Sequence, residues 1–264
     1  DTTSICQGDS VLLDAGAGHT NYLWSTGDTT QTIYASSAGT YNVTVGNGTP
    51  VSNSNSLSFD GQDDDIEIVN DTSLQLTRFT IGGWVYINDV SKKCFILNKG
   101  DSQKRNYRLG INDDLAGDGR VHFFWEENGV NHGTTSNTLL NNNTWYHILG
   151  TYDGITSKLF INGISENPVV EIAIPDISSD EVNIGNAKGW ADTFLDGKLD
   201  DIQIWNKALT QSEIQNYMFC PPTGNEAGLV GYWNFNEGSG NTVTDLTSNG
   251  NNGTINGASW STQI

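Results

Sequence analysis

Basic residues, cysteine, proline and methionine are all scarce in this sequence of 264 residues. Its 12 Lys and Arg stand against 31 Asp and Glu, for a formal net charge of -19, whereas phosphate backbones and anionic lipid surfaces attract clustered positive charge. No run approaches the about 20 apolar residues of a membrane-spanning helix. These absences exclude binding to nucleic acid and insertion into a membrane.

Only three cysteines occur, Cys6, Cys94 and Cys220, and they form no CxxC pair. Neither a zinc site nor a redox motif is therefore indicated. One disulfide can form, in any of three pairings. Cys94 lies in the strand-like segment KKCFILN and is expected to be a small buried hydrophobe. Cys220, beside two prolines, is the better disulfide candidate.

Short runs of alternating apolar and polar residues dominate the pattern, and clusters of Gly, Asn, Ser and Thr separate them. Examples are TIGGWVYI, RVHFFWE, WYHILGTY, SKLFING and DDIQIW. Alternation with period two is typical of half-buried strands. One helix is predicted, from Thr210 to Met218, because Thr210 and Glu213 form a capping box. The sequence thus predicts an all-β protein with a single short helix.

Residues 1–50 have their own pattern of alternating apolar and polar residues, which predicts about five or six short strands around Trp24. The phrases CQGDSVLLDAG, YLWSTGDTTQTI and AGTYNVTV resemble the immunoglobulin-like repeats of secreted and cell-surface proteins of Bacteroidetes. The resemblance implies a small sandwich that acts as a spacer beside a functional domain.

From Ser56 onward the sequence motifs differ from those of residues 1–50. SLSFDGQDDDIEI, FTIGGWVYI, TWYHILGTYDG, KLFINGI and FLDGKLDDIQIWNKALTQSEI resemble the laminin-G-like, concanavalin-like jelly-roll family. The resemblance extends from Ser56 to Ile214 and implies a two-sheet sandwich that more often binds glycans or proteins than catalyses a reaction. We assign this domain to residues 51–264.

The tail from Gly228 to Trp260 resembles a stretch that the family usually places before its FDG segment. Either a second jelly roll begins here, or the domain is circularly permuted and residues 221–264 complete it. We prefer permutation, because an isolated half domain would leave an apolar edge that is prone to association.

Acidic residues crowd the loop after Phe59, where Asp60, Asp63, Asp64 and Asp65 fall within six positions. Such crowding is costly unless a cation or solvent relieves it, and calcium takes six to eight oxygen ligands. The family resemblance implies that this loop meets the later LDD strand and holds calcium, with Asp60, Asp64 and Asp200 as ligands. Asp201 alternates to the opposite face, so its role as a fourth ligand stays open.

A second acidic loop, residues 112–119, fails the EF-hand template in either register, because Ala116 occupies a ligand position. We interpret it as an ordinary turn between strands.

Catalytic patterns are missing as well. No strand carries two carboxylates at i and i+4, as concanavalin-like glycosidases do, and neither a Gly-x-Ser-x-Gly elbow nor HExxH occurs. His122 and His147 lie in strand patterns and are expected to be sheet residues. We therefore expect no enzymatic activity.

Glycan binding needs aromatic faces for stacking and planar polar groups for hydroxyl pairs. Trp190 lies in a Gly-flanked polar loop, and Trp125 ends a strand beside a polar loop, where it could stack or belong to the core. Two arginines stand out in a chain poor in basic residues, and Arg can grip a carboxylate or sulfate. The predicted ligand-binding residues are Trp190, Trp125, Arg105, Arg108, Asn128 and His132.

Three functions remain from the sequence. The first is a non-catalytic carbohydrate-binding module of a secreted or surface polysaccharide-processing protein, attached through flanking modules. The second is a cell-surface adhesion or spacer module that binds protein partners. A glycoside hydrolase or lyase is the third.

Overall fold

A computed structural model describes residues 10–19, 21–37, 39–46, 55–101, 104–114, 116–187 and 189–262. The chain divides into two compact units. The smaller combines Asp1–Ser52 with Ser212–Pro221, and the larger combines Asn53–Gln211 with Pro222–Ile264.

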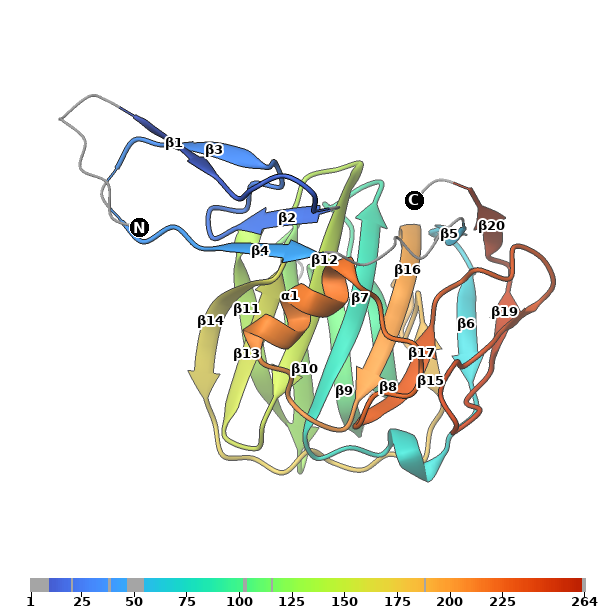
Figure 1. Ribbon diagram of the computed structural model, residues 1–264. Coiled ribbons are helices and arrows are strands. Elements are labelled where there is room, and N and C mark those ends of the chain that lie inside the picture. The colour runs from blue at the N-terminus through green and yellow to red at the C-terminus, as the bar shows by residue number, and fades with distance from the viewer. Residues whose placement is uncertain are drawn as a thin grey trace. The chain divides into compact units, whose positions relative to one another are not determined.

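The smaller unit contains two two-stranded antiparallel sheets (Figure 1). Its described strands are β1 (Val11–Asp14), β2 (Asn21–Trp24), β3 (Thr32–Ala35) and β4 (Val43–Gly46). β1 pairs with β3 and β2 with β4, and Trp24 is buried, its Nε1 donating to the Thr30 carbonyl at 2.8 Å. Four strands thus lie in the described residues, fewer than predicted, and the immunoglobulin-like assignment stays a prediction.

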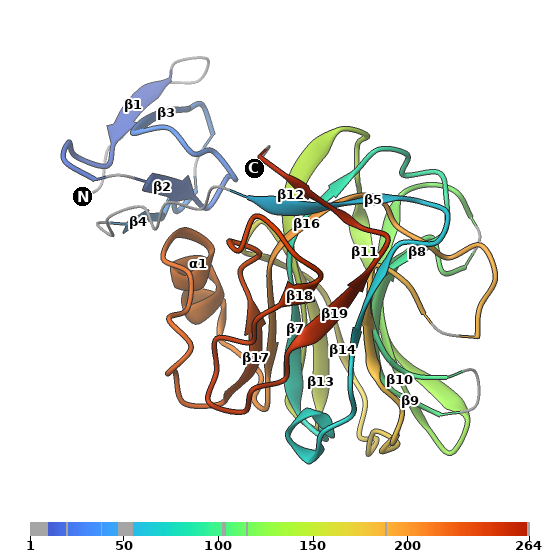
Figure 2. The same cartoon turned by 90° about the vertical axis from the view of Figure 1, so that its right-hand side faces the viewer.

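The larger unit is a sandwich of two antiparallel sheets, which confirms the all-β prediction (Figures 1 and 2). Sheet 1 has the order β11 (Val130–Leu139), β10 (Arg120–Glu127), β9 (Arg105–Ile111), β8 (Cys94–Gly100), β15 (Val182–Ile184), β6 (Asp65–Ile68), β19 (Gly253–Asn256), β18 (Thr242–Val243).

Sheet 2 has the order β14 (Ile164–Val170), β13 (Thr156–Ile161), β12 (Thr144–Tyr152), β7 (Phe79–Ile87), β16 (Asp196–Trp205), β5 (Ser56–Asp60), β20 (Ser259–Ser261). A further strand, β17 (Leu229–Trp233), pairs with β16, and a 3-10 turn, η1 (Thr72–Leu74), precedes β7.

Residues that alternate along each strand fill the space between the two sheets. On β10, Val121, Phe123 and Trp125 all point inward and are fully buried. Trp125 packs against Tyr152 of sheet 2, with the ring centroids 4.1 Å apart, and against Phe79 at 6.1 Å. The prediction that Trp125 binds ligand is therefore wrong, because the phase of its strand places the indole in the core.

The tail of the chain contributes to both sheets. β19 pairs with β6 and β18 with β19 in sheet 1, while β17 pairs with β16 and β20 with β5 in sheet 2. Figure 2 shows β17, β18 and β19, coloured red, beside the earlier strands. Residues 229–261 therefore belong to the same sandwich as residues 56–205.

The helix is α1 (Gln211–Phe219), within one residue of its predicted span at each end, and it buries Ile214 and Met218. It is the one α-helix among the described residues, and none of their helices is long and apolar enough to cross a membrane.

Cys94 is buried, as predicted, and its thiol has no disulfide partner. Burial raises the pKa of the Cys94 thiol to about 12, so the group stays neutral. Cys220 is also a free thiol among the described residues. Cys6 lies outside the described residues, so the prediction that Cys220 is the better disulfide candidate, with its partner left open, stays a prediction.

Candidate functional site: a pocket on the outer face of sheet 1

Several large and charged side chains lie on the face of sheet 1 that points away from the core. Because Val121, Phe123 and Trp125 point inward, strand alternation sends His122 and Phe124 to the opposite face. On the neighbouring strand β9, Tyr107 and Leu109 point inward, and Arg108 points outward beside Phe124, its register partner. This face thus brings together side chains from strands that follow one another in the sheet.

Phe95 of β8 forms the floor of this region and is fully buried, although it lies outside the central core. The Arg108 guanidinium lies over its ring at 4.6 Å and the Lys93 ammonium at 5.1 Å. The glycine at position 110 leaves room for the ring, because a Cβ there would lie 2.5 Å from Phe95 Cδ1. A cation over an aromatic face gains electrostatic attraction.

Trp190 lies in the loop between β15 and β16 and covers the same cations. Its ring centroid is 4.7 Å from Lys93 Nζ, 5.5 Å from Arg105 Cζ and 5.4 Å from Arg108 Cζ. The loop turns tightly there, since the Trp190 N–H donates to the Ala187 carbonyl at 3.3 Å. Three residues that were each predicted to bind ligand, Trp190, Arg105 and Arg108, therefore lie side by side, and their role in binding stays a prediction.

Carboxylates from the turn between β9 and β10 balance part of this charge. Asp113 accepts from Arg108 Nη2 and lies 2.8 Å from Lys93 Nζ. The neighbouring Asp114 Oδ1 is 3.5 Å from His122 Nε2. These residues come from the acidic loop that the sequence assigned to an ordinary turn, and the turn therefore also supplies counter-charges.

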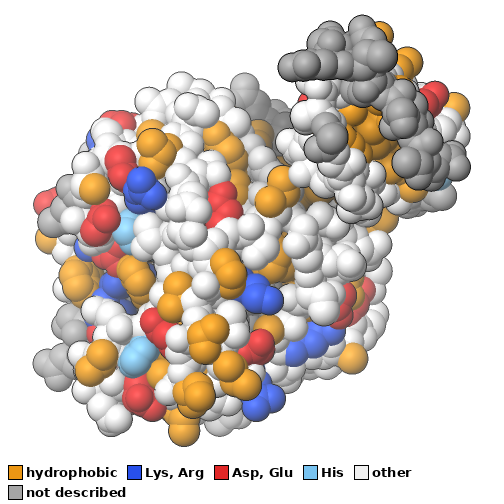
Figure 3. Space-filling model, turned by 90° about the vertical axis from the view of Figure 1, so that its left-hand side faces the viewer, with side chains coloured by type: hydrophobic (Ala, Val, Ile, Leu, Met, Phe, Trp, Pro, Cys, Tyr) orange, Lys and Arg blue, Asp and Glu red, His pale blue; other side chains and the backbone are white. Residues whose placement is uncertain are grey.

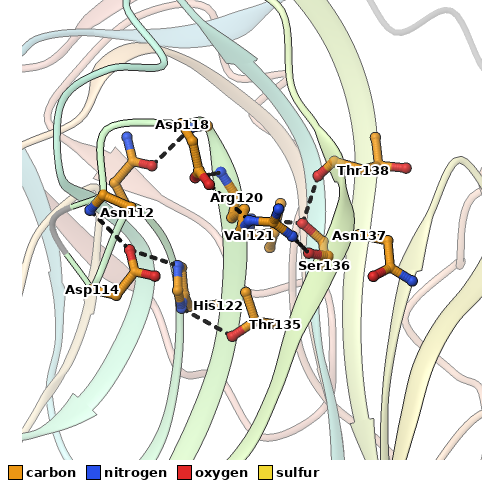
Figure 4. A network of polar contacts seen from close by, with 12 residues as sticks. Asn112, Asp114, Asp118, Arg120, Val121, His122, Thr135, Ser136, Asn137 and Thr138 are labelled. Atoms are coloured by element: carbon orange, nitrogen blue, oxygen red, sulfur yellow. Dashed lines mark hydrogen bonds and ion pairs between the residues drawn. The ribbon is translucent and has the colours of Figure 1, made fainter.

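His122 connects the turn to β11, as Figure 4 shows. Its Nδ1 is 3.2 Å from the Thr135 hydroxyl, and its Nε2 faces Asp114 without a hydrogen bond. Burial lowers the pKa of His122, the carboxylates of Asp114, Asp113 and Asp118 oppose that shift, and Arg108 adds to it. The ring is thus mainly neutral at pH 7.

Arg105 is held on the other side of the pocket. Its Nη2 donates to Glu126 Oε1 and, at 3.0 Å, to Asn131 Oδ1, while its backbone N–H donates to Glu126 Oε2 at 3.2 Å. Burial lowers the pKa of both guanidinium groups, that of Arg108 to about 10, so both remain charged at neutral pH.

Together these side chains enclose a pocket of about 350 Å³. Its lining residues are Lys93, Arg105, Arg108, Asp113, Asp114, His122, Phe124, Asn131, Thr135 and Trp190. We call this the Trp190 pocket. Its volume lies at the lower end of the range for small-ligand sites.

Four buried N–H groups of residues that line this pocket have no hydrogen-bond partner within the described residues: Arg105 Nε, Arg108 Nε, Arg108 Nη1 and Trp190 Nε1. His122 Nε2 is a fifth buried nitrogen of the lining without a partner there. Both arginines are more than nine-tenths buried. Buried donors without an acceptor are rare in folded proteins, so a group of four in one pocket calls for a bound acceptor or water.

Two other predicted binding residues do not line the pocket. Asn128 is exposed in the turn between β10 and β11, with a φ of 53°. His132 stacks on Trp125 at 6.2 Å, and its Nδ1 lies 3.2 Å from Glu171 Oε2. The hairpin instead presents Asn131 and Thr135 to the pocket.

The acidic loop between β5 and β6 gathers three carboxylates. Each of Asp60, Asp63 and Asp64 offers one oxygen, and these oxygens lie within 4.8 Å of one another. Burial raises the pKa of Asp64, although the Asp60 N–H donates to its Oδ2 at 2.8 Å. Oxygen ligands of this type fit a hard cation such as calcium by their chemistry.

The other two predicted metal ligands lie elsewhere. In the register of β5 and β16, Asp60 faces Asp196, whereas Asp200 is four residues further along and pairs with Trp84 of β7. At about 3.3 Å per residue, Asp200 is about 13 Å from that position. Asp201 is buried and accepts from the Tyr232 hydroxyl. The prediction that Asp200 joins Asp60 and Asp64 as a metal ligand is therefore wrong, and Asp201, whose role as a fourth ligand was left open, is bonded to Tyr232 instead.

A second hollow of about 460 Å³ lies beside the Trp190 pocket and shares Lys93 with it. Its other lining residues are Gly61, Gln62, Lys92, Asp192 and Phe194. It therefore extends from the Trp190 loop to the acidic loop after β5.

Seven lining residues were not predicted from the sequence: Lys93, Asp113, Asp114, His122, Phe124, Asn131 and Thr135. Their positions depend on the pairing of β8 with β9, β9 with β10 and β10 with β11. The two arginines near position 105 are unusual in an acidic chain, and they were the feature of the sequence that indicated a binding site. The order of strands that brings Lys93 beside them cannot be derived from the spacing of residues along the chain.

The larger unit is thus a two-sheet antiparallel sandwich with a pocket of aromatic and charged residues on one outer face. A family profile described as the Concanavalin A-like lectin/glucanases superfamily matches residues 60–215, more than half of the chain. The chain belongs to that superfamily, as the resemblance of its larger domain predicted.

Solved structures share the fold. A Bacteroides ovatus protein provisionally described as carbohydrate-binding has 19% sequence identity and a TM-score of 0.66 over 87% of this chain. The present chain spans 66% of that protein, just under two thirds. A heptameric pentraxin from Limulus polyphemus has 17% identity and a TM-score of 0.51, with 64% of this chain and 83% of that chain covered. No curated protein matches the sequence.

Proposed function

We propose that the larger unit is a non-catalytic carbohydrate-binding module that holds a glycan in the Trp190 pocket. The observation that carries this proposal is the combination of aromatic rings with buried, unpartnered N–H donors in one pocket. Sugars offer apolar C–H faces that stack on aromatic rings and hydroxyl oxygens that accept hydrogen bonds. Binding sites generally combine apolar walls with a few placed polar groups in this way.

Binding without cleavage is supported by the state of the pocket carboxylates. Glycoside hydrolysis uses two carboxyl groups, one of which acts as a general acid or nucleophile. Asp113 is instead paired with Arg108 and Lys93, so its oxygens are engaged by two cations. Asp114, the next residue, faces His122. The description of the Bacteroides ovatus relative is consistent with a binding function.

A structural calcium ion in the loop after β5 is part of the proposal. Asp60, Asp63 and Asp64 would hold it through carboxylate oxygens, and it would offset their mutual repulsion. The loop borders the second hollow through Gly61 and Gln62, so an ordered loop would also shape that hollow.

The partner we propose is a polysaccharide or oligosaccharide outside the cell, with the module secreted or displayed at the cell surface. The module would hold a polysaccharide-processing protein on its substrate through flanking modules. Binding rather than turnover would then be the contribution of this unit.

Affinity gel electrophoresis of the whole chain against a panel of soluble polysaccharides tests the proposal. At least one polymer should retard the chain relative to a non-binding protein of similar charge, and Trp190→Ala should abolish most of that retardation. Retardation by no polymer in the panel would contradict glycan binding.

An exposed apolar strip favours the alternative of an adhesion module that binds protein partners. Val170, Ile172 and Ile174 are 74%, 84% and 69% exposed at the end of β14 and just beyond it. Figure 3 shows hydrophobic side chains gathered in the lower part of this side of the larger unit. Exposed patches of this kind often mark protein-binding surfaces. If no glycan binds, this strip is the next surface to test.

A further inference from the structure

The Trp190 pocket gathers basic residues in an acidic chain. Three of the 12 basic residues line it, Lys93, Arg105 and Arg108, together with two of the 31 acidic residues, Asp113 and Asp114. Glu126, which accepts from Arg105, adds a third carboxylate beside the lining, so three cations are balanced by three carboxylates in a chain whose net charge is -19. A pocket that is locally neutral in a strongly negative protein repels an anion less than the rest of the surface does.

The N–H donors of the two pocket arginines are incompletely paired. Asp113 accepts from Arg108 and pairs with Lys93, yet Arg108 Nε and Nη1 have no acceptor within the described residues, nor has Arg105 Nε. Guanidinium groups form strong, charge-assisted hydrogen bonds with planar or tetrahedral oxyanions. The pocket therefore has unused donors of the type that recognises an oxyanion.

On the basis of the glycan binding proposed above, we propose that the Trp190 pocket binds an acidic glycan through a charged substituent. The substituent is a sugar carboxylate or sulfate ester, both of which present oxygens with negative charge. Arg105, Arg108 and Lys93 donate to it, and the Trp190 ring stacks on the sugar that carries it.

The adjoining hollow extends this inference from one sugar to a chain. It shares Lys93 with the Trp190 pocket and adds Lys92, whose side chain is 62% exposed and 3.4 Å from Asp196. A polymer with an acidic group on successive sugars can place one group at the arginines and the next beside Lys92. The ligand class is therefore an acidic polysaccharide.

Changing the ligand tests the proposal without altering the protein. The whole chain is compared on polygalacturonate and on the same polymer after reduction of its carboxyl groups, and on a sulfated galactan and its desulfated form. We expect at least one acidic polymer to bind about tenfold more tightly than its neutral counterpart, and the difference to shrink when salt rises from about 0.1 M to about 1 M.

The two acidic polymers distinguish a carboxylate from a sulfate. Equal binding of each acidic polymer and its neutral counterpart would overturn the acidic specificity but leave glycan binding intact. Failure to bind any acidic or neutral polymer would instead contradict the proposed function itself.

Substitutions in the protein test whether the cations of the pocket bind the acidic group. Lys93→Gln removes one pocket cation, while Arg108 still pairs with Asp113. Lys158→Gln, on β13 of the other sheet, removes the same charge away from the pocket. We expect Lys93→Gln to weaken binding of the acidic polymer about fivefold to tenfold and Lys158→Gln to leave it unchanged.

Arg105→Lys is a second pocket variant, since it keeps the charge but loses the planar donor group. It should also weaken acidic binding, and melting curves verify that each variant is folded. Equal effects of Lys93→Gln and Lys158→Gln would show diffuse attraction and overturn the proposal, as would unchanged binding in both pocket variants.

Discussion

Two tryptophans that the sequence could not separate provide the sharpest test of the site. Trp125 is fully buried between the sheets, whereas Trp190 lies outside the core cluster, over three cations. Substitution with alanine should therefore affect stability at one position and binding at the other.

The magnitudes follow from these surroundings. Trp125→Ala removes a core indole and should cost about 3–5 kcal/mol, which lowers the melting temperature by about 6–20 °C. Trp190→Ala removes contacts with cations that repel one another, so we expect a loss of only about 1 kcal/mol, or about 2–4 °C. As an aromatic anchor it should contribute about 2 kcal/mol to binding, or about thirtyfold in Kd.

The assay combines thermal melts with affinity electrophoresis on whichever polysaccharide retards the wild-type chain. Trp190→Phe is the matched control, since it keeps an aromatic face and should retain most of the binding. If Trp190→Ala lowers the melting temperature as much as Trp125→Ala, Trp190 belongs to the core. If Trp190→Ala is as well retained as wild type, the glycan does not bind at this pocket.

Three further outcomes are expected. Calcium at a hundredfold excess over its Kd should stabilise the folded chain by about 2.7 kcal/mol, and a chelator should reverse this in wild type but not in Asp64→Asn; superimposable melts would contradict the metal proposal. Because burial lowers the pKa of His122 below its ordinary value of 6.5, its ring is mainly neutral at pH 7 and gains positive charge as the pH falls. Retention of an acidic polymer should thus strengthen toward pH 5 in wild type and not in His122→Gln. Gly110→Ala places a Cβ 2.5 Å from the Phe95 ring, so it should lower stability by about 1–3 kcal/mol in a thermal melt; an unchanged melt would refute the close packing.

The sheets were more predictable from the sequence than the pocket. Period-two alternation marks strands, and it located β7, β10, β12 and β16. On β10, however, Phe123 and Phe124 are both aromatic, so the pattern does not reveal which face points inward. The correct phase requires the partner sheet, and Trp125 was misplaced for this reason.

Register explains the other errors. The segment LDGKLDD offers three aspartates, and sequence similarity favoured Asp200, whereas the pairing of β16 with β5 places Asp196 opposite Asp60. Lys93 was missed because it reaches Trp190 only through the order of strands in space. Local sequence reports propensity and periodicity, but it does not report which distant segments become neighbours.

The last strands also affect the order in which the sandwich can assemble. β5 is paired with β16 on one side and with β20 on the other. Ser56 can therefore pair with its register partner Ser261 only after almost the whole chain has been made. β6 likewise gains β19 only after nearly 200 further residues of chain. During synthesis on the ribosome, both strands would leave the exit tunnel with both edges unpaired, because their other neighbours, β16 and β15, also follow much later in the chain. Long-range pairing of this kind slows folding. The unpaired strand edges of the nascent chain can associate with other chains until the late strands β19 and β20 have been synthesised and cover them.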